Sequence, residues 1–205
     1  MKRKLSGNSG KISRMTGIAM LTALVVVLQF ASTFIKLGPV SITLALTPII
    51  IGGAIYGAFC GAYLGFIMGA VIFIAGLFGW DGGFVMMLMQ ESPLLGITVT
   101  FGKSIVAGFV SGLAYKLIGE KHEKAATVTA SALCPIVNTG VFVMFMVLFF
   151  PNLFESAALS DGKSILAYLI LTVAGLNFIF EFLANIGLSS AVKMIIHVIK
   201  HPKGN

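Results

Sequence analysis

The sequence predicts an all-α integral membrane protein, a bundle of six transmembrane helices with both termini in the cytoplasm. Hydrophobic residues make up 58% of the 205-residue chain, charged residues make up 10%, and the mean hydropathy is +1.02. A soluble domain of this length could not bury so much apolar surface, and several apolar runs are long enough to span a bilayer. The runs are continuous blocks, whereas a membrane β-barrel alternates over segments of ~10 residues. Helices therefore remain the spanning structure that satisfies every backbone group.

The chain is expected to form one membrane domain, with the bundle over residues 15–197 and a cytoplasmic tail over 198–205. A polar lead, residues 1–14, is expected to be flexible and cytoplasmic. The apolar run of residues 15–35 is too long for a signal peptide and lacks a convincing cleavage site, so we interpret it as a retained first helix. Ala19 and Ala23 lie one turn apart in it. This spacing lets another helix approach closely, although two alanines in an apolar helix are also common.

The second and third helices are expected within the apolar block of residues 44–78. This block is longer than one helix needs and barely enough for two crossings, so it must fold back, most simply near Gly57. Glycine recurs every fourth residue from Gly53 to Gly69. On a helix this spacing produces a flat ridge, which favours tight helix packing and not chemistry.

The next outer segment, residues 79–93, is unusual for a loop because its centre is apolar and rich in Met. This composition predicts a pliable cover folded over a cavity, to which Trp80, Gln90 and Glu91 would contribute. The alternative is an interfacial or re-entrant half-helix with no role in ligand binding.

The fourth helix, residues 96–118, and the fifth, residues 125–150, each carry polar groups at membrane depth. Lys103 lies roughly 10 Å below the outer end, at 1.5 Å per residue. It either snorkels to the interface or faces inward as a cation for an anionic ligand. In the fifth helix, Pro135 precedes Asn138 in mid-membrane, a combination that often lines a cavity. Helix–helix hydrogen bonding is the alternative for Asn138.

The sixth helix begins near residue 164 and carries Asn177, Glu181 and Asn185 at spacings of four residues, which places them on one stripe. A carboxylate in hydrocarbon is costly unless it faces a partner, water or a ligand, so Glu181 is a functional-site hypothesis. The alternative is that these side chains only join packed helices, each contributing about 0.6 kcal/mol.

The positive residues support this topology. Lys and Arg number five in the N-terminal lead, three in residues 116–124 and three in residues 193–203, whereas the outer loops hold only Lys36 and Lys163. Such a bias sets the positive segments inside. Because these residues flank hydrophobic spans, the net charge of +7 does not indicate nucleic-acid binding.

Catalytic and metal-binding patterns are missing from the sequence. All three His residues lie in the segments assigned to the cytoplasm, and there is no H-E-x-x-H, no G-x-S-x-G and no spaced Cys/His cluster. Cys60 and Cys134 are interpreted as small core hydrophobes. We therefore predict no enzyme, no metal site and no cofactor. Since the chain has no nucleotide-binding domain, active transport would need an ion gradient or partner subunits.

The ordered set of features resembles the substrate-binding S component of energy-coupling factor (ECF) vitamin transporters over about residues 14–197. The resemblance rests on Ala19-x-x-x-Ala23, Thr47-Pro48-Ile-Ile-Ile-Gly52, Tyr56-Gly57-Ala58-Phe59-Cys60-Gly61, Gly102-Lys103, Pro135-Ile-Val-Asn138-Thr139, Asn177-x-x-x-Glu181-x-x-x-Asn185 and Leu188-Ser189-Ser190-Ala191. Ala58 departs from the pattern, because many relatives have Pro after the turn Gly.

The resemblance implies a bacterial plasma-membrane protein that captures a vitamin or related micronutrient from outside. The ligand would lie among helices four to six under the outer loops, and a transmembrane coupling subunit with two cytoplasmic ATPases would complete the importer. Ala19 and Ala23 would contact the coupling subunit. The implied ligand residues are Asn138, Asn177 and Glu181, with Lys103 for an anionic group and Trp80, Gln90 and Glu91 from the cover. Pantothenate is the first expectation, then riboflavin and folate. A stand-alone secondary transporter and a non-transport scaffold are the alternatives.

Overall fold

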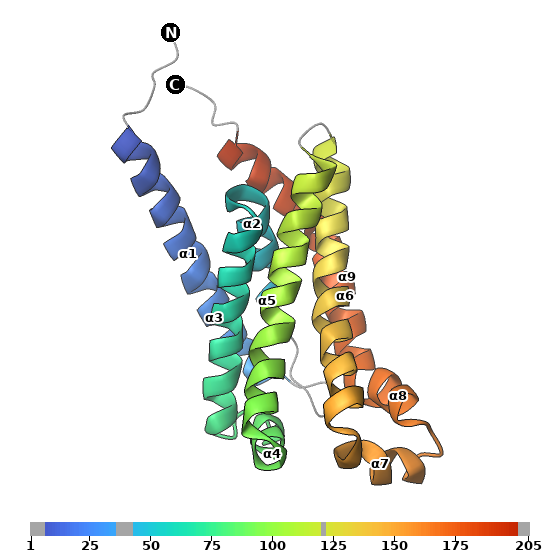
Figure 1. Cartoon of the computed structure of the whole chain (residues 1–205). Helices are drawn as coiled ribbons and strands as arrows, with labels where there is room; N and C mark the ends of the chain where they lie inside the picture. Colours follow the sequence, from blue (N-terminus) through green and yellow to red (C-terminus); the bar gives the residue numbers. More distant parts are fainter. Residues whose placement is uncertain (1–6, 36–42, 120–121, 201–205) are drawn as a thin grey trace.

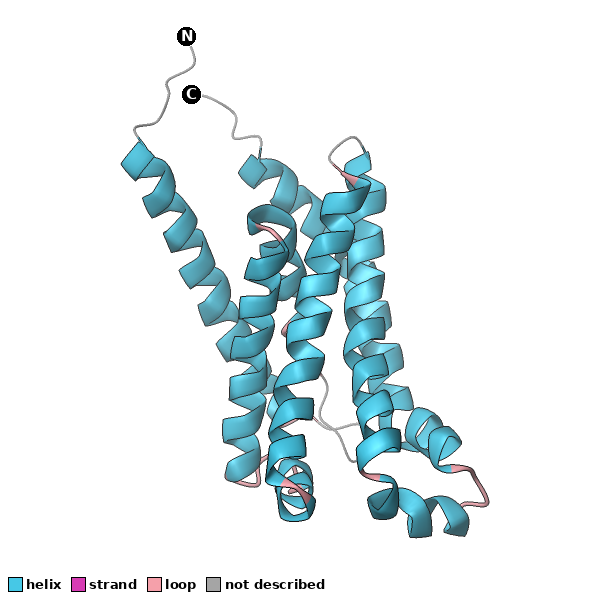
Figure 2. Cartoon of the chain, in the orientation of Figure 1, coloured by secondary structure: helices cyan, strands magenta, loops and turns pink. Residues whose placement is uncertain are grey.

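The computed structural model describes residues 7–35, 43–119 and 122–200, and the regular structure in these ranges is helical, without strands (Figures 1 and 2). In chain order the elements are α1 (Gly7–Thr33), α2 (Leu46–Tyr56), α3 (Ala58–Leu77), α4 (Phe84–Glu91), α5 (Pro93–Ile118), α6 (Glu123–Phe149), α7 (Pro151–Ser160), α8 (Ile165–Tyr168), the π-helical turn η2 (Leu169–Ala174) and α9 (Gly175–Lys200). The prediction of an all-α protein is confirmed.

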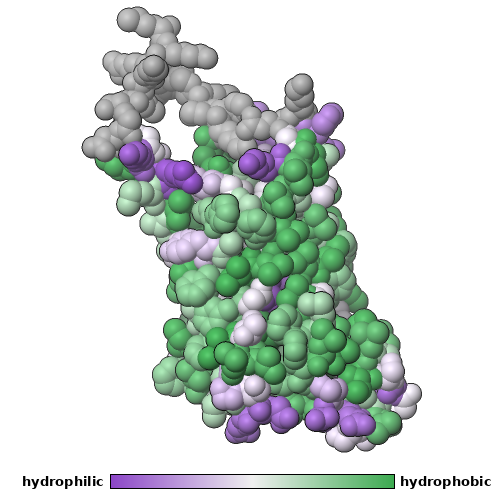
Figure 3. Space-filling model, in the orientation of Figure 1, coloured by the Kyte–Doolittle hydropathy of each residue, from purple (hydrophilic) through white to green (hydrophobic). Residues whose placement is uncertain are grey.

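Five helical stretches are long and apolar enough to cross a membrane. They are residues Gly10–Thr33, Ala58–Leu77, Pro93–Ile118, Glu123–Phe149 and the continuous stretch Ile165–Ile199. Figure 3 shows the surface that results, an apolar belt with hydrophilic side chains toward both ends of the bundle. The chain is therefore a multi-pass membrane protein.

The second expected crossing is much shorter than the others. α2 has 11 residues, which at 1.5 Å per residue is about 16 Å, whereas the hydrocarbon core of a bilayer is about 30 Å thick. The chain does fold back at Gly57, whose φ of 99° favours glycine. Because α2 cannot cross alone, the count of six crossings stays a prediction, while the fold-back within the apolar block is confirmed.

The ends of the described chain lie on one side of the bundle. The start of α1, the end of α5, the start of α6 and the end of α9 lie at the top of Figure 1, and α4 and α7 lie at the opposite end. Helix α1 begins at Gly7 instead of residue 15. Its first turns carry exposed Lys11 and Arg14, and polar turns of this kind extend a transmembrane helix beyond the hydrocarbon. That this end faces the cytoplasm stays a prediction.

The glycine ridge of α3 packs against α5, as the spacing predicts. A Cβ added to Gly61 would overlap the backbone of Gly108, and one added to Gly65 would overlap the backbone of Ser104. Only residues without a Cβ allow two helix backbones to approach so closely. The ridge therefore fixes the position of α5, the helix that carries Lys103.

Candidate functional site

Two adjoining cavities lie inside the bundle. The larger contains about 600 Å³ of space free of protein atoms, part of it open to the surroundings, and the smaller about 320 Å³. The larger is lined by Gln29, Thr33, Thr43, Ile72, Ala75, Asp81, Phe84, Val85, Leu88, Val99, Thr100, Lys103 and Phe142. The smaller is lined by Thr43, Lys103, Asn138, Thr139, Phe142, Ala174, Asn177 and Glu181. Because Thr43, Lys103 and Phe142 line both cavities, they are parts of one site.

The smaller cavity brings together four of the side chains singled out from the sequence. Lys103 comes from α5, Asn138 from α6, and Asn177 and Glu181 from α9. Asn138 is 3% exposed, Asn177 5% and Glu181 4%. Spacing along one helix could place Asn177 beside Glu181, whereas the approach of three helices is a property of the fold. The polar stripe of α9 therefore borders a hollow.

Glu181 is held in place by the segment that leads into α2. Its Oε1 accepts a hydrogen bond from the backbone N–H of Thr43 at 2.8 Å. Thr43 precedes a short turn before α2, so its N–H has no helical carbonyl to bind, and a buried N–H without a partner is costly. The other oxygen, Oε2, is buried and has no hydrogen-bond partner among the described residues. Oε1 therefore has a structural role, whereas Oε2 can accept a hydrogen bond from another donor.

Asn185, the last member of the stripe, has a different role. Its Oδ1 accepts a hydrogen bond from Thr47 Oγ1 of α2 at 3.1 Å. Its Nδ2 donates to the backbone carbonyl of Glu181 at 2.7 Å. Asn185 thus joins α9 to α2 and is not part of the lining of either cavity. For this residue the alternative of polar contact between packed helices is the better interpretation.

Lys103 points into the bundle and lines both cavities. Its Nζ lies 5.1 Å from the centroid of the Phe142 ring, a cation–π distance. Lys103 and Glu181 both line the smaller cavity, but among the described residues no ion pair within 4.0 Å joins them. The site therefore holds one basic and one acidic side chain that do not form an ion pair.

The helix geometry changes just before α9, beside the smaller cavity. The π-helical turn Leu169–Ala174 directly precedes α9, and Ala174 belongs to the cavity lining. A Cβ at Gly175 would lie close to the carbonyl of Ile170, so glycine suits this wider turn. Turns of this kind occur frequently at functional sites, because one extra residue changes which side chains face inward.

The three residues expected from the cover lie away from both cavities in this geometry. The ring of Trp80 is 42% exposed and stacks on Phe78, with 5.1 Å between centroids. Gln90 and Glu91 are exposed at the end of α4. Helix α4 reaches the larger cavity through other side chains, those of Phe84, Val85 and Leu88. A ligand contact by Trp80, Gln90 or Glu91 stays a prediction.

Sequence reasoning missed several lining residues, of which Gln29 is the most informative. It is a strongly polar residue inside the first apolar run, the same signal that drew attention to Glu181. Its side chain is 2% exposed, and Oε1 has no hydrogen-bond partner among the described residues. Thr43 gave no such signal, since it lies in a polar break between helices. Asp81 lines the larger cavity but is occupied: its two oxygens accept the N–H groups of Gly83 and Val85 at 2.8 and 2.7 Å.

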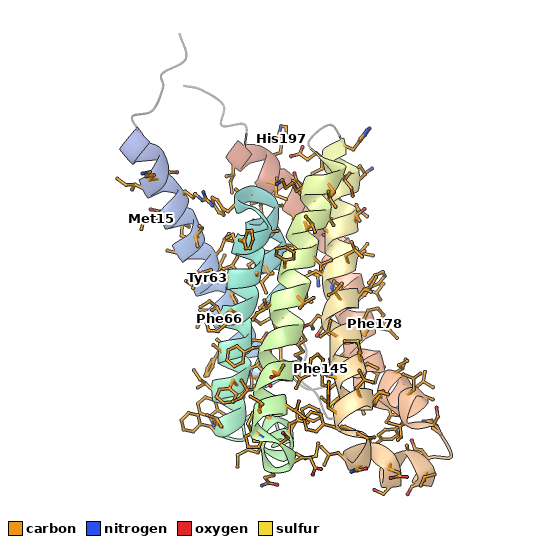
Figure 4. All side chains as sticks on the ribbon, viewed as in Figure 1. Met15, Tyr63, Phe66, Phe145, Phe178 and His197 are labelled. Atoms are coloured by element: carbon orange, nitrogen blue, oxygen red, sulfur yellow. The ribbon has the colours of Figure 1, made fainter. Side chains whose placement is uncertain are left out.

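Ala19 and Ala23 lie on the outside of the bundle, away from the cavities. Both are exposed and line an open groove with Met15, Ile18, Thr22 and Tyr63. Figure 4 shows the two labelled side chains of this groove, Met15 on α1 and Tyr63 on α3. The groove is apolar and lies within the part of α1 that is long enough to span the membrane.

The chain matches the model of a known protein family. The family model described as "ECF transporter, substrate-specific component" matches residues 13–197. No curated protein matches the chain. Within the ranges that the structure describes, no group of three or more His, Cys, Asp and Glu could hold a metal ion.

Proposed function

Because this chain belongs to the family of ECF transporter substrate-specific components, we propose that it is the substrate-capture subunit of an ATP-driven importer in a bacterial plasma membrane. It binds a water-soluble vitamin or related micronutrient from the outer side. A transmembrane coupling subunit and two cytoplasmic ATPases then drive delivery to the inside.

The observation that carries this proposal is a set of buried acceptors without partners around a hollow. Glu181 Oε2, Asn138 Oδ1 and Gln29 Oε1 have no hydrogen-bond partner among the described residues, although all three side chains line the cavities. An unsatisfied buried polar atom costs about 1–3 kcal/mol. A site that only joined helices would use these atoms internally, as Asn185 does. A bound ligand supplies the missing partners.

The remaining walls suit a small organic molecule. Most of the larger cavity is apolar, with Phe84, Leu88 and Val99 among its lining residues. A few polar groups in a mainly apolar cleft fix orientation and provide specificity. Asp81 and the α4 side chains place this cavity near the end of the bundle that carries α4 and α7, opposite the chain ends. We assign that end to the outside, because Lys and Arg are concentrated at the other end.

The groove at Ala19 and Ala23 is our proposed contact for the coupling subunit. Small residues let a partner helix approach α1 closely, and this groove is already open. It lies on the outside of the bundle, so a partner could bind there without entering the cavities. Capture and coupling would then use separate surfaces of one chain.

The experiment that tests this function is purification of the full chain in detergent, with mass spectrometry of any small molecule that remains bound. Pantothenate, riboflavin and folate are then added back in a binding measurement. We expect one vitamin to bind without being transported by vesicles that contain this chain alone. Uptake by such vesicles would instead identify a secondary transporter. If no ligand is found and the Glu181→Ala and Asn138→Ala variants behave like the wild type, the chain is a scaffold.

A further inference from the structure

The ionisable side chains of the cavities point to the charge of the ligand. Among the described lining residues these are Lys103, Glu181 and Asp81. Asp81 binds the backbone N–H groups at the start of α4 through both oxygens, where the helix dipole also favours a negative charge. Lys103 and Glu181 remain and balance each other. An added anion would disturb this balance, and so would an added cation.

Hydrogen-bonding capacity gives a second, independent constraint. The partnerless atoms at the cavities, Glu181 Oε2, Asn138 Oδ1 and Gln29 Oε1, are all acceptors. Asn138 and Glu181 line the same smaller cavity. Two acceptors in neighbouring positions require a ligand edge that carries hydrogen-bond donors. Lys103 offers donors instead, and so requires an acceptor on the ligand.

We infer that the ligand is electrically neutral overall, presents hydrogen-bond donors to Glu181 and Asn138 and an acceptor to Lys103, and lays an apolar or aromatic body against Phe142. This inference rests on the proposed function and narrows it. A carboxylate ligand would pair with Lys103 and leave Glu181 as an uncompensated buried charge, which is strongly unfavourable. Of the three vitamins considered, riboflavin has a neutral aromatic ring with an imide N–H between two carbonyls. Pantothenate and folate are anions, so riboflavin replaces pantothenate as the first expectation.

The first test compares ligands that differ in charge. The purified full chain is titrated calorimetrically at pH 7 with the neutral probes riboflavin, nicotinamide and pyridoxine and with the anionic probes pantothenate, folate and nicotinate. The molecule that co-purifies is identified by mass spectrometry. We expect the co-purified molecule, and the tightest probe, to carry no net charge. An anion as the tightest ligand would overturn the inference and leave the proposed function standing. Binding of nothing at all would overturn the proposed function and the inference together.

The second test changes the charge of the cavity. Glu181→Gln removes the negative charge with little change in shape, so the wild-type ligand should bind at least about tenfold more weakly, the scale of a lost hydrogen bond to a charged group. The selectivity of this variant should shift toward anions. Lys103→Met should shift selectivity toward cations such as thiamine, and the double variant should prefer neutral molecules again. These shifts in charge preference are not expected of a residue with a purely structural role.

Glu155→Gln is the matched control, because Glu155 is exposed on α7 and does not line either cavity. It should bind like the wild type. Size-exclusion profiles and melting temperatures show whether each variant is folded. If Glu181→Gln does not fold, the charge of the co-purified molecule and the selectivity of Lys103→Met test the inference instead. Wild-type affinity for the same ligand in a folded Glu181→Gln variant would show that Glu181 does not meet a donor.

Discussion

The Glu181 carboxylate accepts the backbone N–H of Thr43 at 2.8 Å, across 138 residues of sequence. This bond joins α9 to the segment before the short helix α2, and Oε2 of the same carboxylate, which belongs to a residue of the cavity lining, has no partner among the described residues. One side chain therefore stabilises the break that precedes α2 and also presents an acceptor to the site. We expect each neighbouring residue to have only one of these two roles. A substitution there should therefore change either the stability of the protein or its affinity for the ligand.

Asn185→Ala should reduce stability without reducing affinity. The variant loses the hydrogen bond with Thr47 Oγ1 and the bond to the Glu181 carbonyl, and each is worth about 0.5–1.5 kcal/mol. We expect a lower melting temperature in detergent and a dissociation constant within twofold of the wild type, measured with the co-purified ligand. A loss of affinity that persists in folded protein would place Asn185 in the binding site.

Asn138→Ala should have the opposite profile. Its Oδ1 has no partner among the described residues, so the unliganded protein loses little when the amide is removed. A ligand that donates to this atom loses a hydrogen bond. We expect affinity to fall about tenfold, corresponding to about 1.4 kcal/mol, with a melting temperature near that of the wild type. Equal effects on affinity in Asn138→Ala and Asn185→Ala would contradict this assignment of roles.

The contrast between Asn177 and Asn185 shows what sequence could predict about the site. Periodicity placed both on one stripe of the sixth helix with Glu181, and this is confirmed. The two residues are of the same type and carry the same signal, so their separate roles depend on what lies opposite. Helix α2 faces Asn185 through Thr47, whereas the cavity faces Asn177. The separate roles of the two asparagines therefore depend on how the helices pack, which the spacing within one helix does not show.

The length of α2 shows a similar limit for the fold. An apolar block of residues 44–78 predicts two helices and a fold-back, because its total length exceeds one span. It does not show where the first of them begins. The break before Leu46 depends on a distant partner, Glu181, which satisfies the N–H of Thr43. Hydropathy indicates whether a segment lies in lipid or in water, but it does not reveal a hydrogen bond to a distant residue.

Close packing of α3 and α5 should be sensitive to one methyl group. Gly108→Ala places a Cβ against the Gly61 backbone, where a flexible side chain is not available to move aside. Overpacking of this kind typically costs about 1–3 kcal/mol. We expect a lower melting temperature, and weaker binding as well because α5 carries Lys103.

Gly140→Ala is the matched control for this variant, since a Cβ at Gly140 of α6 has nothing within 4 Å. Alanine is favoured over glycine in a helix by up to about 1 kcal/mol, so Gly140→Ala should leave stability unchanged or raise it. Equal behaviour of the two variants would mean that the contact between Gly61 and Gly108 is not close.

Bulky residues in the α1 groove should abolish assembly and leave binding intact. Ala19→Trp and Ala23→Trp fill the groove beside Tyr63, so a helix of the coupling subunit could no longer approach. Met20→Trp and Leu24→Trp are the controls, because these neighbours are exposed but do not line the groove. Pull-down of the coupling subunit and ATPases measures assembly. Retention of the complex by both alanine variants would show that the partner binds another surface.

Gln29→Met should weaken binding while leaving the unliganded protein as stable or more stable. The side chain is buried beside the larger cavity, and its Oε1 has no hydrogen-bond partner within the described ranges. Replacing it with an apolar side chain of similar length removes an unsatisfied acceptor, a change worth about 1–3 kcal/mol in favour of the empty state. Any ligand that donates to Oε1 loses that bond, so the melting temperature of the empty protein and the affinity should move in opposite directions. Asn152→Met, at an exposed amide side chain of α7 outside both linings, should change neither. If Gln29→Met lowered the melting temperature and left affinity unchanged, Gln29 would support the helix packing and would not contact the ligand.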